Sequence, residues 1–293
     1  MSLSPDNGMS PDEMRTRLEE IDTRIHKALI ERAALEAGQS AGQNSELPLF
    51  RPERDADQIR QLVERHSGPL PLAALEQIWR DIICACTNLG ADTAVYLDGT
   101  AELIEMLDLA RFYFGFSVEL VPASDASDVV GAVSDKARDL GIIALNDRAE
   151  LPWWRGLSET GARVRARLPF VVLDERPADL PALVLARDDR LVDTADVAVY
   201  DARWSDRLPG KLMDQGIEVL SFFRSANGVD ALLAISGELT EEDVKTACIA
   251  AGAEPDVLRC VGGYAAPIDG ENDQEDAFES TEPSGPGEGE PQE

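Results

Sequence analysis

Apolar positions in the first part of the chain recur with the spacing of a helix. Ser10 and Glu13 bracket Pro11 in the arrangement of a capping box, which predicts a helix start. Apolar side chains then follow at steps of four, three, four, three and seven residues, at Met14, Leu18, Ile21, Ile25, Ala28 and Leu35. This spacing predicts one helix to about residue 42, with a continuous apolar seam of the coiled-coil type.

Two shorter helices are predicted after this long one. The first is "PERDADQIRQLVERH", opened by Pro52, and the second is "LAALEQIWRDIICACTNLG", which follows the helix-breaking segment "SGPLP". A 30-residue helix is roughly 45 Å long, so three helices in about eighty residues cannot close a compact core around it. Its seam therefore favours a second long helix alongside, most simply from an identical chain.

Beyond Gly90 the pattern changes to strands that alternate with helices. "DTAVYL", "SVELVPA" and "LGIIALN" are separated by two helical segments, and this β-α-β-α-β series predicts a parallel α/β layer. "RVRARLPFVVLDE" and "PALVLARDD" are predicted as further strands. From about Asp193 the predicted order is strand, helix "DRLPGKLMDQG", strand, strand, helix and strand, which is the ferredoxin-like βαββαβ arrangement.

These patterns predict a multidomain chain, as its 293 residues also suggest. We expect an all-α three-helix domain at 10–91, a single α/β lobe at 92–192 and a βαββαβ domain at 193–266. Residues 267–293 are predicted to be a disordered acidic tail, because Asp269 to Glu293 hold ten acidic residues, no basic one, and many Pro, Gly and Ser.

The charge balance narrows the classes of partner. The chain has 56 acidic and 27 basic residues and a net charge of −29, which argues against nucleic acids and anionic membranes. The sequence has neither an apolar run of about 18 residues nor a signal peptide, and we predict a cytoplasmic protein. The four cysteines are interpreted as free thiols, and the sequence predicts no metal site.

Arginines at two positions of the helical region suggest a small anionic ligand. Extending the apolar seam by four residues from Ala28 reaches Arg32, where a charged group requires a partner or a ligand. A salt-bridged or snorkelling arginine is the alternative interpretation. Arg51 and Arg54 lie in "LPLFRPERD", at the entrance of the second helix. A local arginine cluster can bind a small anion within an acidic chain, since charges are screened over about 8 Å.

The helix that carries Arg15 and Arg32, followed by "RPERD" and "IWRDIICACTNL", resembles the all-helical chorismate mutase family over roughly residues 11–90. "ARFYFGFSVELVPASDASDVVGAVSDKARDLGIIALN" is similar to the first lobe of a prephenate dehydratase domain. "LPGKL" through "VLRCVGGYAAPI" is similar to the ACT regulatory domain. The domain order is that of the bifunctional chorismate mutase–prephenate dehydratases, in a shortened form.

The resemblance implies a mutase that isomerises chorismate, a dianion, to prephenate in aromatic amino-acid biosynthesis, without a cofactor. It implies that Arg15, Arg32 and Arg54 bind the two substrate carboxylates and that Asp55 orients the substrate hydroxyl. Arg32 and Asp55 are the predicted catalytic residues. Arginine suits this task because its planar fork grips a carboxylate bidentately. Arg15 and Arg32 lie 17 residues apart, roughly 25 Å along one helix, so the resemblance implies that Arg15 comes from the partner of a homodimer.

Three positions depart from the mutase pattern. Gln43 stands where the family has a lysine that donates to the ether oxygen, and Gly90 stands where it has Gln or Glu. Asp55 is one methylene shorter than the usual glutamate. Losing one donor at an oxygen that gains charge typically costs about 3–4 kcal/mol in the transition state. A catalytically impaired regulatory or metabolite-binding protein is therefore the alternative, and a purely structural dimerisation module is a third reading.

The C-terminal regions depart further from their families. Leu180, Pro181 and Ala182 stand at the Thr-Arg-Phe signature of the dehydratases, and the middle region is too short for two lobes. We therefore expect no dehydratase activity. In the ACT-like part, "FFRS" at 222–225 replaces the Glu-Ser-Arg-Pro motif, and Gly210 is interpreted mainly as a plain loop–helix glycine.

Overall fold

The computed structural model describes residues 9–42, 52–87, 93–174, 176–187, 195–237 and 239–270. The positions of Gln43 and Gly90, and the predicted tail from residue 271 onward, lie outside these ranges. The helices are α1 Pro11–Gly42, α2 Pro52–Glu64, α3 Leu72–Thr87, α4 Leu103–Phe114, α5 Ala126–Asp135 and α6 Glu241–Ala251. Two short 3₁₀ helices, η1 Trp153–Gly156 and η2 Met213–Gln215, complete the described helical structure.

The strands form one large sheet and one small one. They are β1 Ala94–Leu97, β2 Glu119–Pro122, β3 Leu140–Ala144, β4 Arg163–Leu168, β5 Val171–Val172, β6 Ala182–Ala186, β7 Val197–Trp204, β8 Ile217–Ser225, β9 Gly228–Ser236, β10 Val257–Tyr264 and β11 Ile268–Asp269. The large sheet has the order β2-β1-β3-β6-β4-β10-β7-β9-β8, and β11 pairs with β5. Strands β2, β1 and β3 are parallel, as the alternating pattern predicts.

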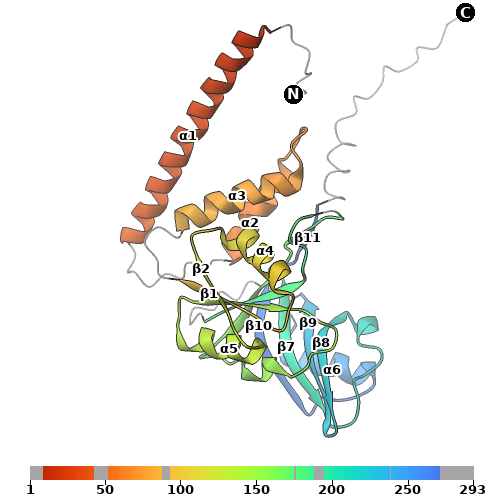
Figure 1. The fold of residues 1–293 in the computed structure, drawn as a ribbon. Coiled ribbons are helices and arrows are strands. Elements are labelled where there is room, and N and C mark those ends of the chain that lie inside the picture. Colours follow the sequence, from red (N-terminus) through yellow and green to blue (C-terminus); the bar gives the residue numbers. More distant parts are fainter. Residues whose placement is uncertain are drawn as a thin grey trace, which may run out of the picture.

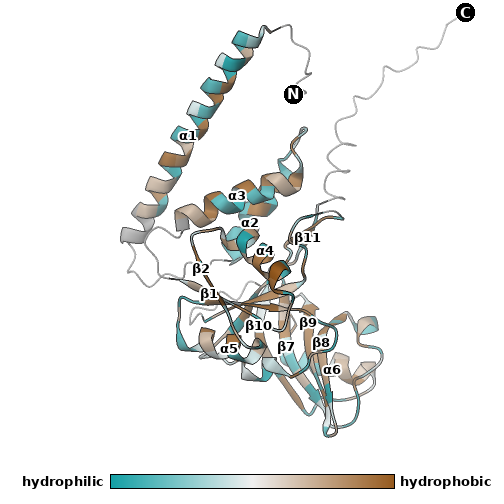
Figure 2. Cartoon of the chain, viewed as in Figure 1, coloured by the Kyte–Doolittle hydropathy of each residue, from teal (hydrophilic) through white to brown (hydrophobic). Residues whose placement is uncertain are grey.

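Helix α1 extends away from the rest of the chain (Figure 1). It begins with the predicted capping box: the backbone N–H of Ser10 donates to Glu13 Oε2 over 2.7 Å, and that of Glu13 donates to Ser10 Oγ over 3.3 Å. Apolar and polar residues alternate along its whole length (Figure 2). The predicted seam lies in solvent in the single chain, because Leu18 is 54% exposed and Leu35 is 65% exposed.

Helices α2 and α3 pack against the sheet region as well as against each other. Ile59 and Leu62 of α2 and Ile83 of α3 share a buried cluster with Phe170 and Val171, which lie between β4 and β6. Arg60 of α2 also donates to the carbonyl of Ala266 over 3.1 Å. The core of these two helices is therefore completed by residues from the far side of the predicted boundary at 91/92.

The sheet region has a core on each face. One cluster centres on α5 and η1, a second on α4, and a third on α6. Strands β3 and β6 are buried at every position, which agrees with their continuous apolar sequences because both of their faces are covered. The sheet continues through a pairing of β4 with β10, so the α/β region and the last four long strands share one sheet across the predicted boundary at 192/193.

The prediction of one helix in the C-terminal region is wrong. "DRLPGKLMDQG" forms a loop and the single 3₁₀ turn η2 between β7 and β8, and only α6 of the two expected helices is present. Pro209 disfavours helical geometry at the residue before it, and Gly216 has a left-handed φ of 73° that ends the turn. The described structure thus bears out a helical region followed by a mixed α/β region with a large sheet, and the ACT-type fold stays a prediction.

Candidate functional site

Two of the predicted arginines meet at one carboxylate. Arg32 lies on α1, Arg54 lies in the first turn of α2, and Glu36 lies one helical turn after Arg32. Both terminal nitrogens of Arg54 donate to Glu36, Nη1 to Oε2 over 3.4 Å and Nη2 to Oε1. Arg32 Nη2 is 4.0 Å from the same Oε1 atom. The fold therefore brings guanidinium groups from two helices close to one carboxylate.

These residues line an open pocket of about 320 Å³, called here the arginine pocket. Its lining residues are Arg32, Leu35, Glu36, Arg54, Gln58, Gln61, Arg65 and Trp79. Three arginines and one glutamate give the pocket a net positive charge within an acidic chain. The guanidinium of Arg65 lies 5.7 Å from the centre of the Trp79 ring, a cation–π distance. Such a pocket suits a small anion with an apolar body, since its guanidinium groups can bind carboxylates.

The position of Arg32 depends on α3 as well as on α1. Its Nη1 atom donates to the carbonyl of Ile82 over 3.4 Å, which joins the two helices beside the pocket. The side chains of Arg32 and Arg54 are 25% and 37% exposed, so both are partly shielded and both remain accessible. A partly shielded guanidinium binds an anion more strongly than a fully exposed one, because less water screens the interaction.

Arg15 lies outside the arginine pocket. Its side chain is 72% exposed and pairs with Asp12 over 3.3 Å near the start of α1. The 17 residues between Arg15 and Arg32 correspond to roughly 25 Å of helix, so one copy of the chain does not bring the two arginines to one small ligand.

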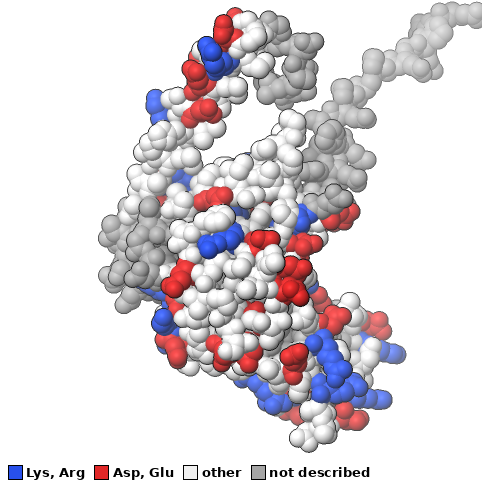
Figure 3. Space-filling view, in the orientation of Figure 1, with Lys and Arg blue, Asp and Glu red and all other residues white. Residues whose placement is uncertain are grey.

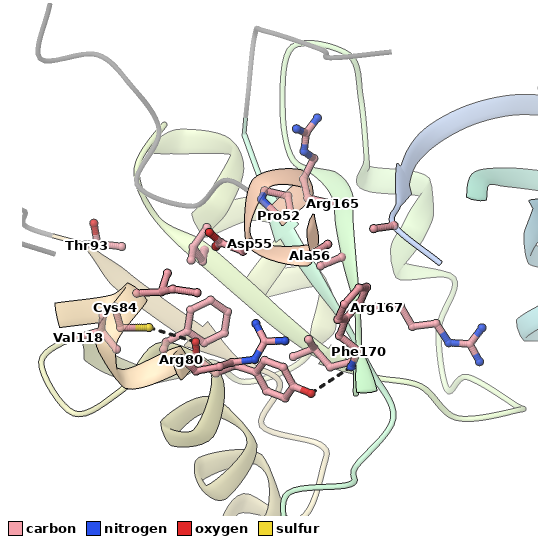
Figure 4. Close-up of a pocket in the computed structure, with 17 residues that line it drawn as sticks. Pro52, Asp55, Ala56, Arg80, Cys84, Thr93, Val118, Arg165, Arg167 and Phe170 are labelled. Carbon is pink, nitrogen blue, oxygen red and sulfur yellow. Dashed lines mark hydrogen bonds between the residues drawn. The ribbon is translucent and has the colours of Figure 1, made fainter. Parts of the chain in front are cut away.

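Asp55 lines a different pocket, on another face of α2. Asp55 lines this second pocket together with Pro52 and Ala56, whereas Arg54 lines the arginine pocket. This second cavity, of about 70 Å³, lies between the helices and the sheet region (Figure 4) and is called here the junction pocket. Its lining includes Arg80 and Cys84 of α3, Tyr113 of α4, and Arg165 and Leu168 of β4.

A buried ionic cluster stands beside the junction pocket. Arg80 donates to Glu76 Oε1 over 3.0 and 3.1 Å, and Arg176 Nη1 is 3.3 Å from Glu76 Oε2. Arg80 also lies 4.4 Å from the centre of the Tyr113 ring, and the Tyr113 hydroxyl accepts a hydrogen bond from Arg176 over 3.2 Å. The Glu76 side chain is fully buried and that of Arg176 is 1% exposed. This cluster joins α3 to the sheet region.

Burial and charge shift the pKa values of groups at this junction. Burial is the largest single influence on the pKa of Arg80 and lowers it, but the attraction of Glu76, together with that of Tyr113 and Asp55, outweighs burial and the pKa is raised. Burial, and secondarily Glu76, raises the pKa of the Tyr113 phenol. Burial, with a contribution from Asp55, raises the pKa of the Cys84 thiol to about 12, so this thiol stays protonated at neutral pH. Tyr113 and Cys84 are therefore neutral at pH 7, and Arg80 is paired with Glu76, so the three groups have a structural role rather than a reactive one.

Glu36 and Glu76 were not predicted from the sequence. Each lies four residues from an arginine on its own helix, Glu36 after Arg32 and Glu76 before Arg80. That spacing is the detectable signal, because residues four apart share one face of a helix. The second arginine of each cluster, Arg54 or Arg176, comes from another part of the fold and has no local signal in the sequence.

On the face of the molecule seen in Figure 3, acidic and basic side chains are scattered among uncharged ones. No helix among the residues that the structure describes is both long and apolar enough to cross a membrane.

Comparisons with known proteins point to one family. Residues 14–90 match the model of chorismate mutase type II. The bifunctional chorismate mutase/prephenate dehydratase of Aquifex aeolicus is 32% identical over 146 residues, and the protein of the same name from Stutzerimonas stutzeri is 27% identical over 143 residues. Each match covers 47% of this chain and only 39% of the relative.

A solved structure described as a novel type of quorum quenching acylase, GqqA, covers 60% of this chain with 12% identity. Its TM-score of 0.41 is too low to support an argument about fold or function. The sequence matches agree with the arginine pocket, since that pocket is formed within the matched residues 14–90. Residues 14–90 of this chain therefore match the chorismate mutase type II family model, and the chain is similar to the bifunctional chorismate mutase/prephenate dehydratases over 39% of their length.

Proposed function

We propose that this protein is a chorismate mutase that acts as a homodimer in the cytoplasm, in the biosynthesis of aromatic amino acids. One observation carries the proposal: Arg32 of α1 and Arg54 of α2 converge on one carboxylate in an accessible pocket of about 320 Å³. This pocket lies within the residues that match the type II mutase model. Chorismate carries two carboxylates, so paired guanidinium groups are the donors that its binding requires.

In the proposed reaction the arginines hold chorismate in a compact, chair-like conformer. The rearrangement needs no cofactor and no covalent intermediate, and its rate depends on positioning and on stabilising the ether oxygen as it gains negative charge. No lysine occurs between Lys27 and Lys136. Gln58 and Gln61, which line the arginine pocket, supply neutral donors instead. We therefore expect turnover below that of an enzyme with a lysine at this oxygen.

The homodimer is supported by the apolar seam of α1. Met14, Leu18 and Ile25 are each more than half exposed in the single chain, on a helix that stands apart from the sheet (Figure 1). Pairing with the α1 helix of a second copy buries such a seam and is a common arrangement in homo-oligomers. In an antiparallel pair, Arg15 of the partner subunit approaches the end of α1 that carries Arg32, which supplies the third arginine of the proposed site.

The role of Asp55 remains a prediction. Its carboxylate lines the junction pocket rather than the arginine pocket, which does not favour direct contact with a substrate held by Arg32 and Arg54. We keep Arg32 and Arg54 as the residues that carry the proposed activity. Replacement of Asp55 by Asn tests whether it contributes to catalysis or only to the packing of α2.

The decisive experiment is the disappearance of chorismate absorbance with the purified full-length protein. We expect turnover by the wild type, a loss of at least about 100-fold in kcat/KM for Arg32→Ala, and no change for Arg17→Ala. Arg17 is a matched control, because it lies on α1 and pairs only with Glu20 among the described residues. Wild-type turnover no higher than that of Arg32→Ala would rule out the enzyme.

The second candidate is a non-catalytic protein that binds an aromatic metabolite. The absence of a lysine between Lys27 and Lys136 favours a protein without catalytic activity, and the accessible arginine pocket favours ligand binding over a purely structural module. It predicts thermal stabilisation by prephenate or phenylalanine without consumption of chorismate. The same purified protein therefore distinguishes the two candidates.

A further inference from the structure

We propose that Glu36 is a specificity-determining residue: it occupies the position of a ligand carboxylate in the arginine pocket and disfavours dianionic ligands. This inference rests on the proposed function, since it concerns the same pocket. It starts from the contacts of Glu36, whose two carboxylate oxygens both accept hydrogen bonds from Arg54, while Arg32 Nη2 lies 4.0 Å away.

A guanidinium fork binds one carboxylate bidentately, and Glu36 takes up this capacity of Arg54. A ligand carboxylate that approaches Arg54 must replace Glu36 or share the guanidinium with it. In either case Glu36 lowers the affinity, by competition in the first case and by repulsion between like charges in the second. A dianion is affected more than a monoanion, because both of its charges lie in the same small pocket.

The surroundings of Glu36 allow this exchange. Its side chain is 18% exposed and borders an open pocket, and its partner Arg54 is 37% exposed. Glu76, which also lies between two arginines, is fully buried, and its partner Arg80 lies over the ring of Tyr113. A ligand reaches Glu36 from the pocket without any separation of packed elements, whereas Glu76 is reached only by opening the junction.

The test replaces Glu36 by Gln, which keeps the size of the side chain and removes its charge. Glu31→Gln is the matched control: Glu31 is exposed on the same helix and does not line the pocket. Chorismate KM is measured by absorbance, and the dissociation constant of prephenate by calorimetry at constant ionic strength. We expect both to fall about tenfold in Glu36→Gln and to stay unchanged in Glu31→Gln. Binding of benzoate, a monoanion, should gain less than that of prephenate.

The outcomes separate this inference from the proposed function. If the wild type turns over chorismate and Glu36→Gln binds prephenate no more tightly, the mutase stands and the role of Glu36 is overturned. If affinity falls, Glu36 positions the arginines instead, and the inference is equally overturned. If no variant turns over chorismate, prephenate binding still tests Glu36. The double variant Glu36→Gln with Arg54→Ala should lose the gain, because the effect acts through Arg54.

Discussion

The apolar side chains of helix α1 and of the nine-stranded sheet differ in their exposure to solvent. Strands β3 and β6 are buried at every position, with helices or 3₁₀ turns packed over the sheet, whereas Leu18 and Leu35 of α1 are more than half exposed. Both regions have regular apolar patterns. The described residues cover both faces of the sheet but leave the seam of α1 exposed, and a second copy of the chain is a suitable cover for that seam.

The two arginine clusters show the same difference for charge. In each, one glutamate lies between two arginines: Glu76 with Arg80 and Arg176, and Glu36 with Arg32 and Arg54. The Glu76 cluster is buried and covered by aromatic rings, so it holds the junction together. The Glu36 cluster opens onto a pocket, so its arginines are available to a ligand. Access, rather than composition, separates a structural cluster from a binding one.

The largest effect is expected from removal of the buried glutamate. Glu76→Ala leaves Arg80 and Arg176 buried without their carboxylate, and loss of one partner from a buried ion pair costs about 3–5 kcal/mol in the free energy of unfolding. Urea denaturation measures this value. The matched variant Glu36→Ala should cost no more than about 1 kcal/mol, because its pair is partly exposed. Equal losses for the two variants would remove the distinction between the clusters.

The next effect concerns the seam of α1. Leu18→Glu places a charge in the proposed interface of both copies, and we expect the dimer dissociation constant to rise at least about 100-fold, or about 2.7 kcal/mol. Sedimentation at low micromolar concentration measures the shift, and chorismate turnover should fall with it. Asp22→Asn is the control, because Asp22 is exposed on α1 and outside the seam. A wild-type protein that sediments as a stable, active monomer would contradict the shared site.

A third test compares two cations at one position. Arg54→Lys keeps the charge and removes the planar fork that grips a carboxylate through two parallel hydrogen bonds. We expect kcat/KM for chorismate to fall about 10- to 100-fold, while urea stability stays nearly unchanged. Arg65→Lys, at the rim of the same pocket, should have a smaller effect. If Arg54→Lys retained full activity, charge alone would account for binding.

Local patterns were sufficient for much of the fold. The capping box formed by Ser10 and Glu13 predicted the start of α1. The change to alternating strands and helices after Gly90 predicted that β2, β1 and β3 are parallel. Both depend on residues close together in the sequence. The failed prediction, a helix over "DRLPGKLMDQG", also has a local cause, since Pro209 and Gly216 oppose a helix more strongly than the intervening residues favour one.

The residues of the candidate site could be selected from the sequence only in part. The resemblance selected Arg32 and Arg54, which the fold brings together, but it grouped them with Asp55, which lines another pocket. The partners Glu36 and Glu76 were missed because each cluster combines an i,i+4 pair with an arginine from elsewhere in the fold. Contacts between separate elements depend on how α2 and α3 pack against the sheet, and no periodicity within one element contains that information.

The smallest expected effect compares the capping boxes of two helices. Asp243 accepts hydrogen bonds from the hydroxyl and the backbone N–H of Thr240 at the start of α6, and these bonds lower the pKa of Asp243. Glu13 is held by Ser10 at the start of α1, and its pKa is lowered for the same reason. A lowered pKa contributes stability above the unfolded-state value of about 4, and the contribution is lost as pH falls through the folded-state value.

Helix α6 packs on the sheet through Val244 and Cys248, so the loss of its cap should reach the cooperative core, whereas the start of α1 projects into solvent. Asp243→Asn should therefore lower the melting temperature of the sheet region slightly at pH 7 and reduce its decline between about pH 5 and pH 3. Glu241→Gln, in the same turn but outside the box, is the control for charge. In a monomeric variant whose α1 seam is disrupted, Glu13→Gln should leave that melting transition unchanged, because an unpacked helix end frays locally. In the proposed wild-type dimer, where a second copy covers the seam, Glu13→Gln should shift the transition, and no shift there would mean that α1 melts independently of the sheet.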